Sequence, residues 1–338
     1  LSSTSSTIIN FAKEQARNLI KNFKNYNGSE PASIIEIASN DGYFIEELKK
    51  VTFCQNIYGI EPSLNAAKIS QKKGHKVYQG LFNLKELSNI KDFVGCIPDL
   101  IIANNVIPHV ENIHDFFSSI DKVSNEKTLI GIQFQYFISL YEGLQFDSIY
   151  HECHNYFSLK SLSKIVDEYG FKIISSTPNN YHGGSLMVIL SKKCRKINNE
   201  GIKLLINKEK NFHDNLLINS AKFNFKLNIF RENMKSYISK LKNSGLKIYG
   251  YGAPAKAITM ANFFDLDNTM IEFIVDINNL KHNKLLPGTN IPIYSPEFLI
   301  LDKAEHILVF PWNLFPEIKA QLIKMKKFTE IRSVYDFK

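Results

Sequence analysis

The densest group of titratable side chains in this 338-residue chain lies between Asp147 and Tyr156. Its consecutive members are Tyr150, His151, Glu152, Cys153 and His154. Phenol, imidazole, carboxylate and thiol groups gathered in one short loop are typical of proton transfer, because a histidine of ordinary pKa ~6.5 changes its charge near neutral pH. The segment therefore predicts a proton-transfer site on a loop.

A second group follows the short apolar stretch Ser33–Ile37, which contains Glu36. The stretch runs into a turn of small residues, where the backbone can approach a ligand closely and a glycine can open a helix. At the end of the next apolar stretch, a carboxylate can accept both hydroxyls of a ribose. The turn lacks G-x-G-x-x-G, so the pattern favours adenosylmethionine over a dinucleotide. The expected cofactor contacts are Glu36, Ala38, Asn40, Asp41, Gly42, Glu61 and Pro62.

Two further polar groups border apolar stretches. Asn104 and Asn105 follow the run LIIA, and His109 comes four residues later. Polar residues at the carboxyl end of such a strand lie where a methyl donor would bind, so both asparagines are expected to contact the cofactor. His182 and Gly183 precede another apolar run, and the glycine permits close approach of the backbone to a bound molecule. We expect these two residues to contact the substrate.

A glycine turn recurs late in the chain, where Gly250 and Gly252 end the stretch LKIY. Asp276 ends the following stretch, and the combination imitates a dinucleotide site. Tyr251 and Lys256 lie on the turn and at the start of the next helix, where free backbone N–H groups favour a diphosphate. We expect Tyr251 and Lys256 to bind substrate, and an NAD-dependent oxidoreductase acting through residues 246–276 is an alternative.

Apolar strands alternate with helical patterns in both halves of the chain, which predicts parallel sheets covered by helices. The expected fold class is α/β: a Rossmann-like class I methyltransferase domain, a helical linker and a second, smaller Rossmann-like domain. The expected ranges are an N-terminal helical segment at 1–28, an adenosylmethionine-binding domain at 29–195, a linker at 196–245 and a C-terminal domain at 246–338.

Composition narrows the class of protein. The net charge is +8, but no basic-aromatic cluster indicates a nucleic-acid partner. No signal peptide and no uncharged apolar run of ~18 residues is visible, so no membrane span is expected. The cysteines are scattered without a CxxC pair, which argues against a metal site or disulfides and favours a cytoplasmic location. They are Cys54, Cys96, Cys153 and Cys194.

Seven strings occur in an order that resembles the nucleotide-sugar C-methyltransferase family. They are EIASNDG, GIEPS, ANNVIPHV, FDSIYHECHNYF, HGGS, YGYGAPAKA and VFPWN, and they cover nearly the whole chain. The resemblance implies an S-adenosylmethionine-dependent enzyme of carbohydrate biosynthesis. Such enzymes methylate carbon 3 of a 4-keto-deoxysugar carried on a nucleoside diphosphate. It further implies that the C-terminal domain helps to hold the nucleotide-sugar.

The family's Tyr-His-Glu-His run supplies active-site residues, and the resemblance carries this role to Tyr150, Glu152 and, from the ANNV segment, His109. The family's second histidine, its expected base, is replaced here by Cys153, and His154 follows it. We expect His154 to act as base in preference to Cys153, because a histidine needs no tuning of its pKa. The cysteine leaves open O- or N-methylation of a sugar nucleotide, or a non-catalytic nucleotide-sugar-binding protein.

The family also begins with a small cysteine-bound zinc domain that contributes a tyrosine to the active site. The present sequence starts at Leu1 and contains no such domain. We therefore expect a processed or truncated start.

Overall fold

The computed structural model describes residues 5–193, 199–325 and 328–338, so Cys194 lies outside the described residues. The chain forms two compact units. The first comprises the residues up to Ser139 together with Glu152–Asp214, and the second comprises Leu140–His151 together with Asn215–Lys338. The titratable segment Asp147–Tyr156 is thus divided between the units: the residues up to His151 belong to the second unit, and those from Glu152 onward belong to the first.

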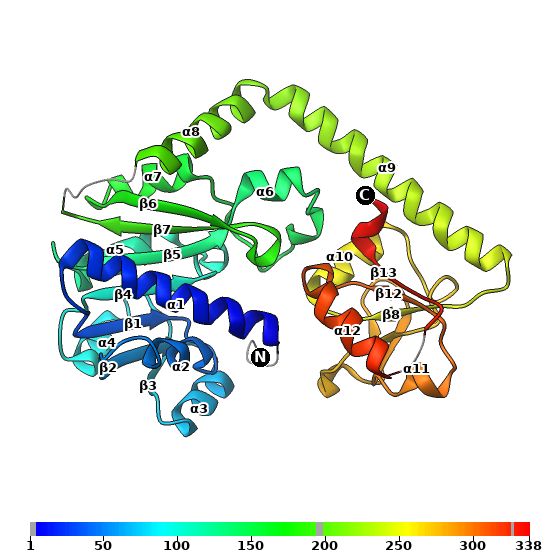
Figure 1. Cartoon of the computed structure of the whole chain (residues 1–338), viewed down its shortest axis with the longest axis horizontal. Helices are drawn as coiled ribbons and strands as arrows, with labels where there is room; N and C mark the ends of the chain where they lie inside the picture. The colour runs from blue at the N-terminus through cyan, green and yellow to red at the C-terminus, as the bar shows by residue number, and fades with distance from the viewer. Residues whose placement is uncertain (1–4, 194–198, 326–327) are drawn as a thin grey trace. The chain divides into compact units, whose positions relative to one another are not determined.

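Within the described residues, the first unit contains a seven-stranded sheet in the order β3-β2-β1-β4-β5-β7-β6 (Figure 1). The bounds are β1 Ser33–Ile37, β2 Asn56–Glu61, β3 Lys76–Gln79, β4 Leu100–Asn104, β5 Leu129–Gln135, β6 Lys172–Asn179 and β7 Ser185–Ser191. Strand β7 is antiparallel to its two neighbours, and the first five strands are parallel. The strand order reverses between β1 and β4, and such reversals place a crevice at the carboxyl ends of the strands.

Helices cover the first sheet. They are α1 Ser6–Asn27, α2 Tyr43–Lys49, α3 Leu64–Lys72, α4 Leu87–Val94, η2 Ile107–His109, α5 Ile113–Val123, α7 Leu159–Asp167, η4 Tyr181–Gly183 and α8 Asn199–Asp214. Helix α1 begins where the Ser5 hydroxyl accepts the N–H of Ile8, and it ends at Gly28 with φ 75°. Its buried face, which includes Ala16 and Leu19, packs on β-strand residues of the core.

The second unit is also α/β. Its described residues form a six-stranded sheet in the order β10-β11-β9-β8-β12-β13. The strands are β8 Ile248–Tyr251, β9 Ile274–Val275, β10 Lys284–Leu286, β11 Ile291–Tyr294, β12 His306–Val309 and β13 Glu330–Ser333. The helices are η3 Phe146–Ser148, α9 Leu216–Asn243, α10 Ala255–Phe263, η5 Asn279–Lys281, α11 Phe298–Leu301, η6 Trp312–Leu314, α12 Phe315–Met325 and η7 Val334–Phe337. Helix α6, Phe137–Glu142, crosses from one unit to the other.

The α/β prediction is confirmed, with one Rossmann-like sheet in each unit. The helical stretch expected at 196–245 consists of α8 in the first unit and α9 in the second. In the part of the chain that the structure describes, no helix combines the length and the apolar character needed to cross a bilayer.

Candidate functional site

A cavity of about 510 Å³ opens at the carboxyl ends of β1, β2 and β4 in the first unit. Four predicted site residues line it: Ala38, Pro62, Asn105 and His109. The stretch Leu81–Asn83, which follows β3, lines it as well and was missed in the sequence. The stretch could have been found because it directly follows a strand, so it lies at the same edge of the sheet as the predicted residues.

The backbone around this cavity is strained. Ala38, Asn40 and Asn105 have φ values of 54°, 52° and 56°, in the left-handed region that residues with a side chain rarely adopt. The first two follow β1 and the third follows β4, the two strands between which the sheet order reverses. Strained residues persist where the surrounding structure holds them and cluster at ligand sites, so this edge of the sheet is the strongest site candidate.

Glu61 ties the two cofactor turns together. Its Oε2 accepts the N–H of Asn40 at 2.8 Å, and its Oε1 accepts the N–H of Ser63 at 2.8 Å. The carboxylate is only 5% exposed, so these bonds fix its orientation before any ligand arrives. Each carboxylate oxygen has a further lone pair, and the residue can still accept ribose hydroxyls.

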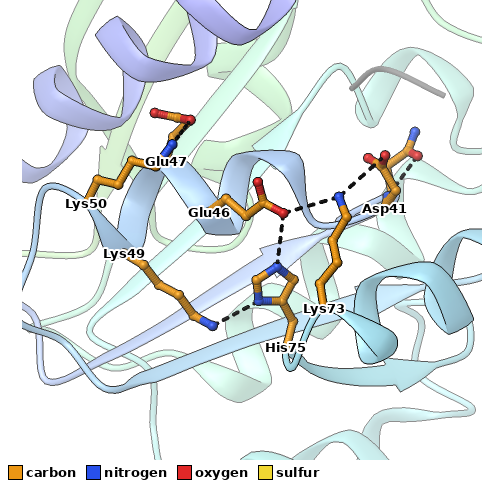
Figure 2. Close-up of polar contacts among 8 residues, drawn as sticks. Asp41, Glu46, Glu47, Lys49, Lys50, Lys73 and His75 are labelled. Carbon is orange, nitrogen blue, oxygen red and sulfur yellow. Dashed lines mark hydrogen bonds and ion pairs between the residues drawn. The ribbon is translucent and has the colours of Figure 1, made fainter. Parts of the chain in front are cut away.

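A cluster of charged side chains supports the turn from outside (Figure 2). The Nζ of Lys73 lies 3.8 Å from Asp41 and 3.2 Å from Glu46, and Lys49 donates to Nδ1 of His75 at 2.9 Å. Burial and the neighbouring Lys49 lower the pKa of His75, which keeps its ring neutral.

Gly42 is required by the same packing. Its φ is 80°, and a Cβ added there would lie 2.4 Å from the Cδ2 atom of His75 and 2.4 Å from Ser70 Oγ. The glycine thus lets the turn settle directly on the ring of His75.

Glu36, on β1, is a buried acid. It is 2% exposed, and its Oε2 has no hydrogen-bond partner among the described residues. Burial, followed by the negative charges of Glu61 and Asp41, raises its pKa well above the ordinary value, and Asn104 partly offsets this. Asn104 is itself held by Gln15 of α1, whose Nε2 donates to its Oδ1 at 2.8 Å.

These groups fit S-adenosylmethionine. Its sulfonium and ammonium give it a positive charge, and three buried carboxylates, Glu36, Asp41 and Glu61, surround the turn. The orphaned Oε2 of Glu36 would gain a partner from a cationic ligand. The apolar walls at Leu81 and Phe82 suit an adenine ring.

His109 carries the candidate proton-transfer chemistry. Its Nδ1 lies 2.8 Å from the carbonyl oxygen of Glu152. A carbonyl can only accept, so Nδ1 carries the proton and Nε2 is left as the basic nitrogen. The neighbouring Cys153 is the main cause that raises the pKa of His109, against the opposing effect of burial.

The remaining loop residues contribute differently. The backbone N–H groups of His154 and Asn155 donate to the carbonyl of Pro108, which places this part of the loop beside η2. His109 and His154 are both exposed, but His109 lines the cavity and His154 does not. Geometry therefore favours His109 over His154, the residue that the sequence favoured as base.

The His182–Gly183 turn lies at the carboxyl end of β5, since the carbonyl of His182 accepts the side chain of Gln135 at 3.2 Å. His182 has φ 49°, a further strained residue at this edge. A Cβ on Gly184 would lie 2.5 Å from the Cβ of Ser139, so at least this glycine serves packing.

The glycine turn of the second unit is explained by internal packing. A Cβ on Gly250 would lie 2.4 Å from Ile274, and one on Gly252 would lie 2.4 Å from Pro311. Asp276 accepts the N–H of Ala253 at 2.8 Å and pairs with Lys281 at 3.0 Å. The two glycines that imitate a dinucleotide site are thus required by packing within the unit, and the acid is bonded to neighbouring residues of the same unit.

The two substrate candidates of this unit are also engaged. Tyr251 is 6% exposed, and burial raises its pKa; its predicted contact with substrate stays a prediction. Lys256 Nζ donates to Ser148 Oγ at 2.8 Å and lies 3.8 Å from Asp147. In addition, no group of three or more His, Cys, Asp or Glu side chains that could hold a metal occurs in the described ranges.

Comparison with known proteins indicates a methyltransferase. Residues 10–176 match a methyltransferase domain, and residues 180–330 match a C-methyltransferase C-terminal domain. The C-methyltransferase NovU of Streptomyces niveus is 24% identical over 286 residues, which are 84% of this chain and 67% of NovU. The protein is thus an S-adenosylmethionine-dependent methyltransferase. The two matched domains together account for most of the chain.

Solved structures give distant likenesses only. The plantazolicin methyltransferase BpumL, solved with SAH, is 16% identical, with a TM-score of 0.45 over 54% of this chain and 86% of BpumL. A possible histamine N-methyltransferase from Thermotoga maritima is 17% identical, with a TM-score of 0.40 over 55% of this chain and 91% of that protein. At these scores the likenesses carry no argument about this protein.

Proposed function

We propose that this enzyme methylates the carbon beside the ketone of a keto-deoxysugar carried on a nucleoside diphosphate, in surface-polysaccharide or glycan biosynthesis. The observation that carries the proposal is the placement of His109, which borders the cavity that fits the cofactor and whose Nδ1 is held by the carbonyl of Glu152 at 2.8 Å. The match to a C-methyltransferase domain and the order of the seven sequence strings support the same chemistry.

His109 would act as the base. Its Nε2 takes the proton from the carbon beside the ketone. The C–H electron pair forms a double bond to the carbonyl carbon, and the π electrons of the carbonyl move onto its oxygen, which gives the enolate. Tyr150, an active-site residue by resemblance, would donate a hydrogen bond to the enolate oxygen. When bound, S-adenosylmethionine supplies the electrophilic methyl group that the enolate carbon accepts. The abstracted proton leaves His109 for solvent, which restores the base.

Cofactor binding is assigned to the first unit. Glu61 would accept the ribose hydroxyls, and Glu36 and Asp41 would face the cationic end of the cofactor. His182 and Gly183, at the carboxyl end of β5, remain candidates for substrate contact. A role of the second unit in holding the nucleotide-sugar is inferred from the resemblance alone.

The proposal is tested by incubating the full chain with adenosylmethionine and a panel of 4-keto nucleotide-sugars. The expected product carries one extra methyl group on carbon, identified by mass spectrometry and by NMR of the new C-methyl signal. A methyl ether or methylamine as the product would show that O- or N-methylation is the reaction. Binding of a nucleotide-sugar without turnover would contradict the proposed catalysis.

A further inference from the structure

Asp147 is a fully buried carboxylate in the loop segment that the second unit holds. Its Oδ2 accepts the indole N–H of Trp312 at 2.8 Å, and its Oδ1 accepts the hydroxyl of Tyr335. Lys256 adds a positive charge 3.8 Å from Oδ2. Donors from η6 and η7 and the cation on α10 thus converge on one carboxylate, which satisfies a charge that burial alone would make unfavourable.

The neighbouring residues are fixed to the same unit. Phe146 is buried with its ring centroid 4.2 Å from that of Phe263. Ser148 is 1% exposed and accepts Lys256 at 2.8 Å. Leu144 has a strained φ of 54°, and its carbonyl accepts the hydroxyl of Tyr335 at 3.1 Å.

The donors also pack against one another. The rings of Trp312 and Tyr335 are 4.5 Å apart, and Lys256 Nζ lies 5.6 Å from the centroid of the Trp312 ring. Burial and the adjacent Asp147 raise the pKa of Tyr335, so its hydroxyl keeps the proton that it donates.

A buried charge network adds little to stability compared with an apolar contact of the same volume, but it fixes one geometry. The geometry fixed here is that of residues 144–148, and Tyr150 follows only two residues later. Because consecutive Cα atoms are ~3.8 Å apart, fixing residues 144–148 restricts where Tyr150 can lie.

We propose that Asp147, Trp312, Tyr335 and Lys256 form an anchor through which the C-terminal unit positions Tyr150 for the methyl transfer. The anchor rests on the proposed function for the role of Tyr150. It makes Lys256 a positioning residue instead of a diphosphate ligand. It also gives one shared task to three sequence strings that lie far apart in the chain, FDSIY, YGYGAPAKA and VFPWN.

The test compares two chemically identical deletions in the second unit. Tyr335→Phe removes the hydroxyl that Asp147 accepts, and Tyr249→Phe removes one that Asp302 accepts at 2.7 Å, away from the anchor. Hydrogen–deuterium exchange of the amides at 144–151 and the kinetic constants are measured for both full-length variants, together with calorimetric affinity for adenosylmethionine.

We expect Tyr335→Phe to speed exchange at 144–151 and to lower kcat about tenfold or more, with cofactor affinity unchanged, whereas Tyr249→Phe does neither. In a Tyr150→Phe background, Tyr335→Phe should add less than about threefold, since both changes act through the same hydroxyl. Full additivity of the two changes would overturn the anchor, and so would equal exchange in the two single variants. Faster exchange in an enzyme that turns over no keto-sugar would overturn the proposed function while the anchor itself stands.

Discussion

Nδ1 of His109 donates its proton to the carbonyl oxygen of Glu152 at 2.8 Å, and the neighbouring Cys153 is the main cause that raises the pKa of the ring. The loop that carries the cysteine therefore both orients the imidazole and raises its pKa. We propose that this histidine is the base.

His109→Gln should lower kcat by about a hundredfold or more, the usual contribution of a general base, while adenosylmethionine affinity stays within about threefold. His154→Gln is the matched control, because the same substitution is made in an exposed histidine that does not line the cavity. We expect it to change kcat by less than about threefold. Equal losses of kcat in the two variants would contradict His109 as the base, and a greater loss in His154→Gln would indicate that His154 is the base.

Cys153→Ala should shift the pH dependence of kcat. Cys153 is the main cause that raises the pKa of His109, and burial alone would lower it. The basic form of His109 would then be populated at lower pH, so the rising limb of the kcat–pH profile should move toward acid. Cys96→Ala, at the exposed cysteine of the same unit, should leave the limb in place. An unmoved limb in Cys153→Ala would separate Cys153 from the base.

The raised pKa of His109 also makes the stability of the fold depend on pH. Because the pKa of His109 is raised on folding, its stabilising contribution is complete below the unfolded value of ~6.5 and is lost as pH rises through the folded value. The difference in thermal stability between the wild type and His109→Gln should accordingly shrink with rising pH in that window.

Glu61→Ala should weaken adenosylmethionine binding about ten- to a hundredfold, because charge-assisted hydrogen bonds to the ribose would be lost. The structure adds that the Asn40 turn loses its acceptor as well. Glu30→Ala is the control, since Glu30 also accepts a loop N–H, from Phe53 at 2.8 Å, but precedes β1, whereas Glu61 lies at the carboxyl end of β2. Calorimetry that finds the same affinity in both variants would remove Glu61 from the cofactor site.

Glu36→Gln should stabilise the cofactor-free protein and weaken cofactor binding. The folded pKa of Glu36 is raised, so its favourable contribution is present below the ordinary pKa of ~4.3 and is lost as pH rises toward the folded value. The gain in melting temperature of Glu36→Gln over the wild type should therefore grow from pH 5 upward. A gain that is independent of pH, or absent, would show that folding does not raise the pKa of Glu36.

The cofactor turn could be predicted from sequence because its signals are local. Strand, small-residue turn and helix succeed one another within 33–49, and Glu61 ends the next strand. The other wall at Leu81–Asn83 was missed because β3 has four residues, too few for a clear alternating pattern.

Long-range pairings had no sequence signal. Asp147 and Trp312 lie 165 positions apart, and His109 and the Glu152 carbonyl 43 apart, so no periodicity links them. For the same reason Lys256 resembled a phosphate ligand at a helix start, although its charge is directed to Asp147 and Ser148.

The central claim is that His109 removes a carbon-bound proton from a keto-sugar, and solvent exchange tests it without methyl transfer. The full chain is incubated in D₂O with a 4-keto nucleotide-sugar and S-adenosylhomocysteine in place of the methyl donor, and the sugar is followed by NMR. The account predicts that deuterium enters the carbon beside the ketone with the wild type and with His154→Gln, and that the rate falls by about a hundredfold with His109→Gln. Undiminished exchange in His109→Gln would contradict the assignment of the base. Absence of exchange in a wild type that still forms a methylated sugar would contradict carbon methylation itself.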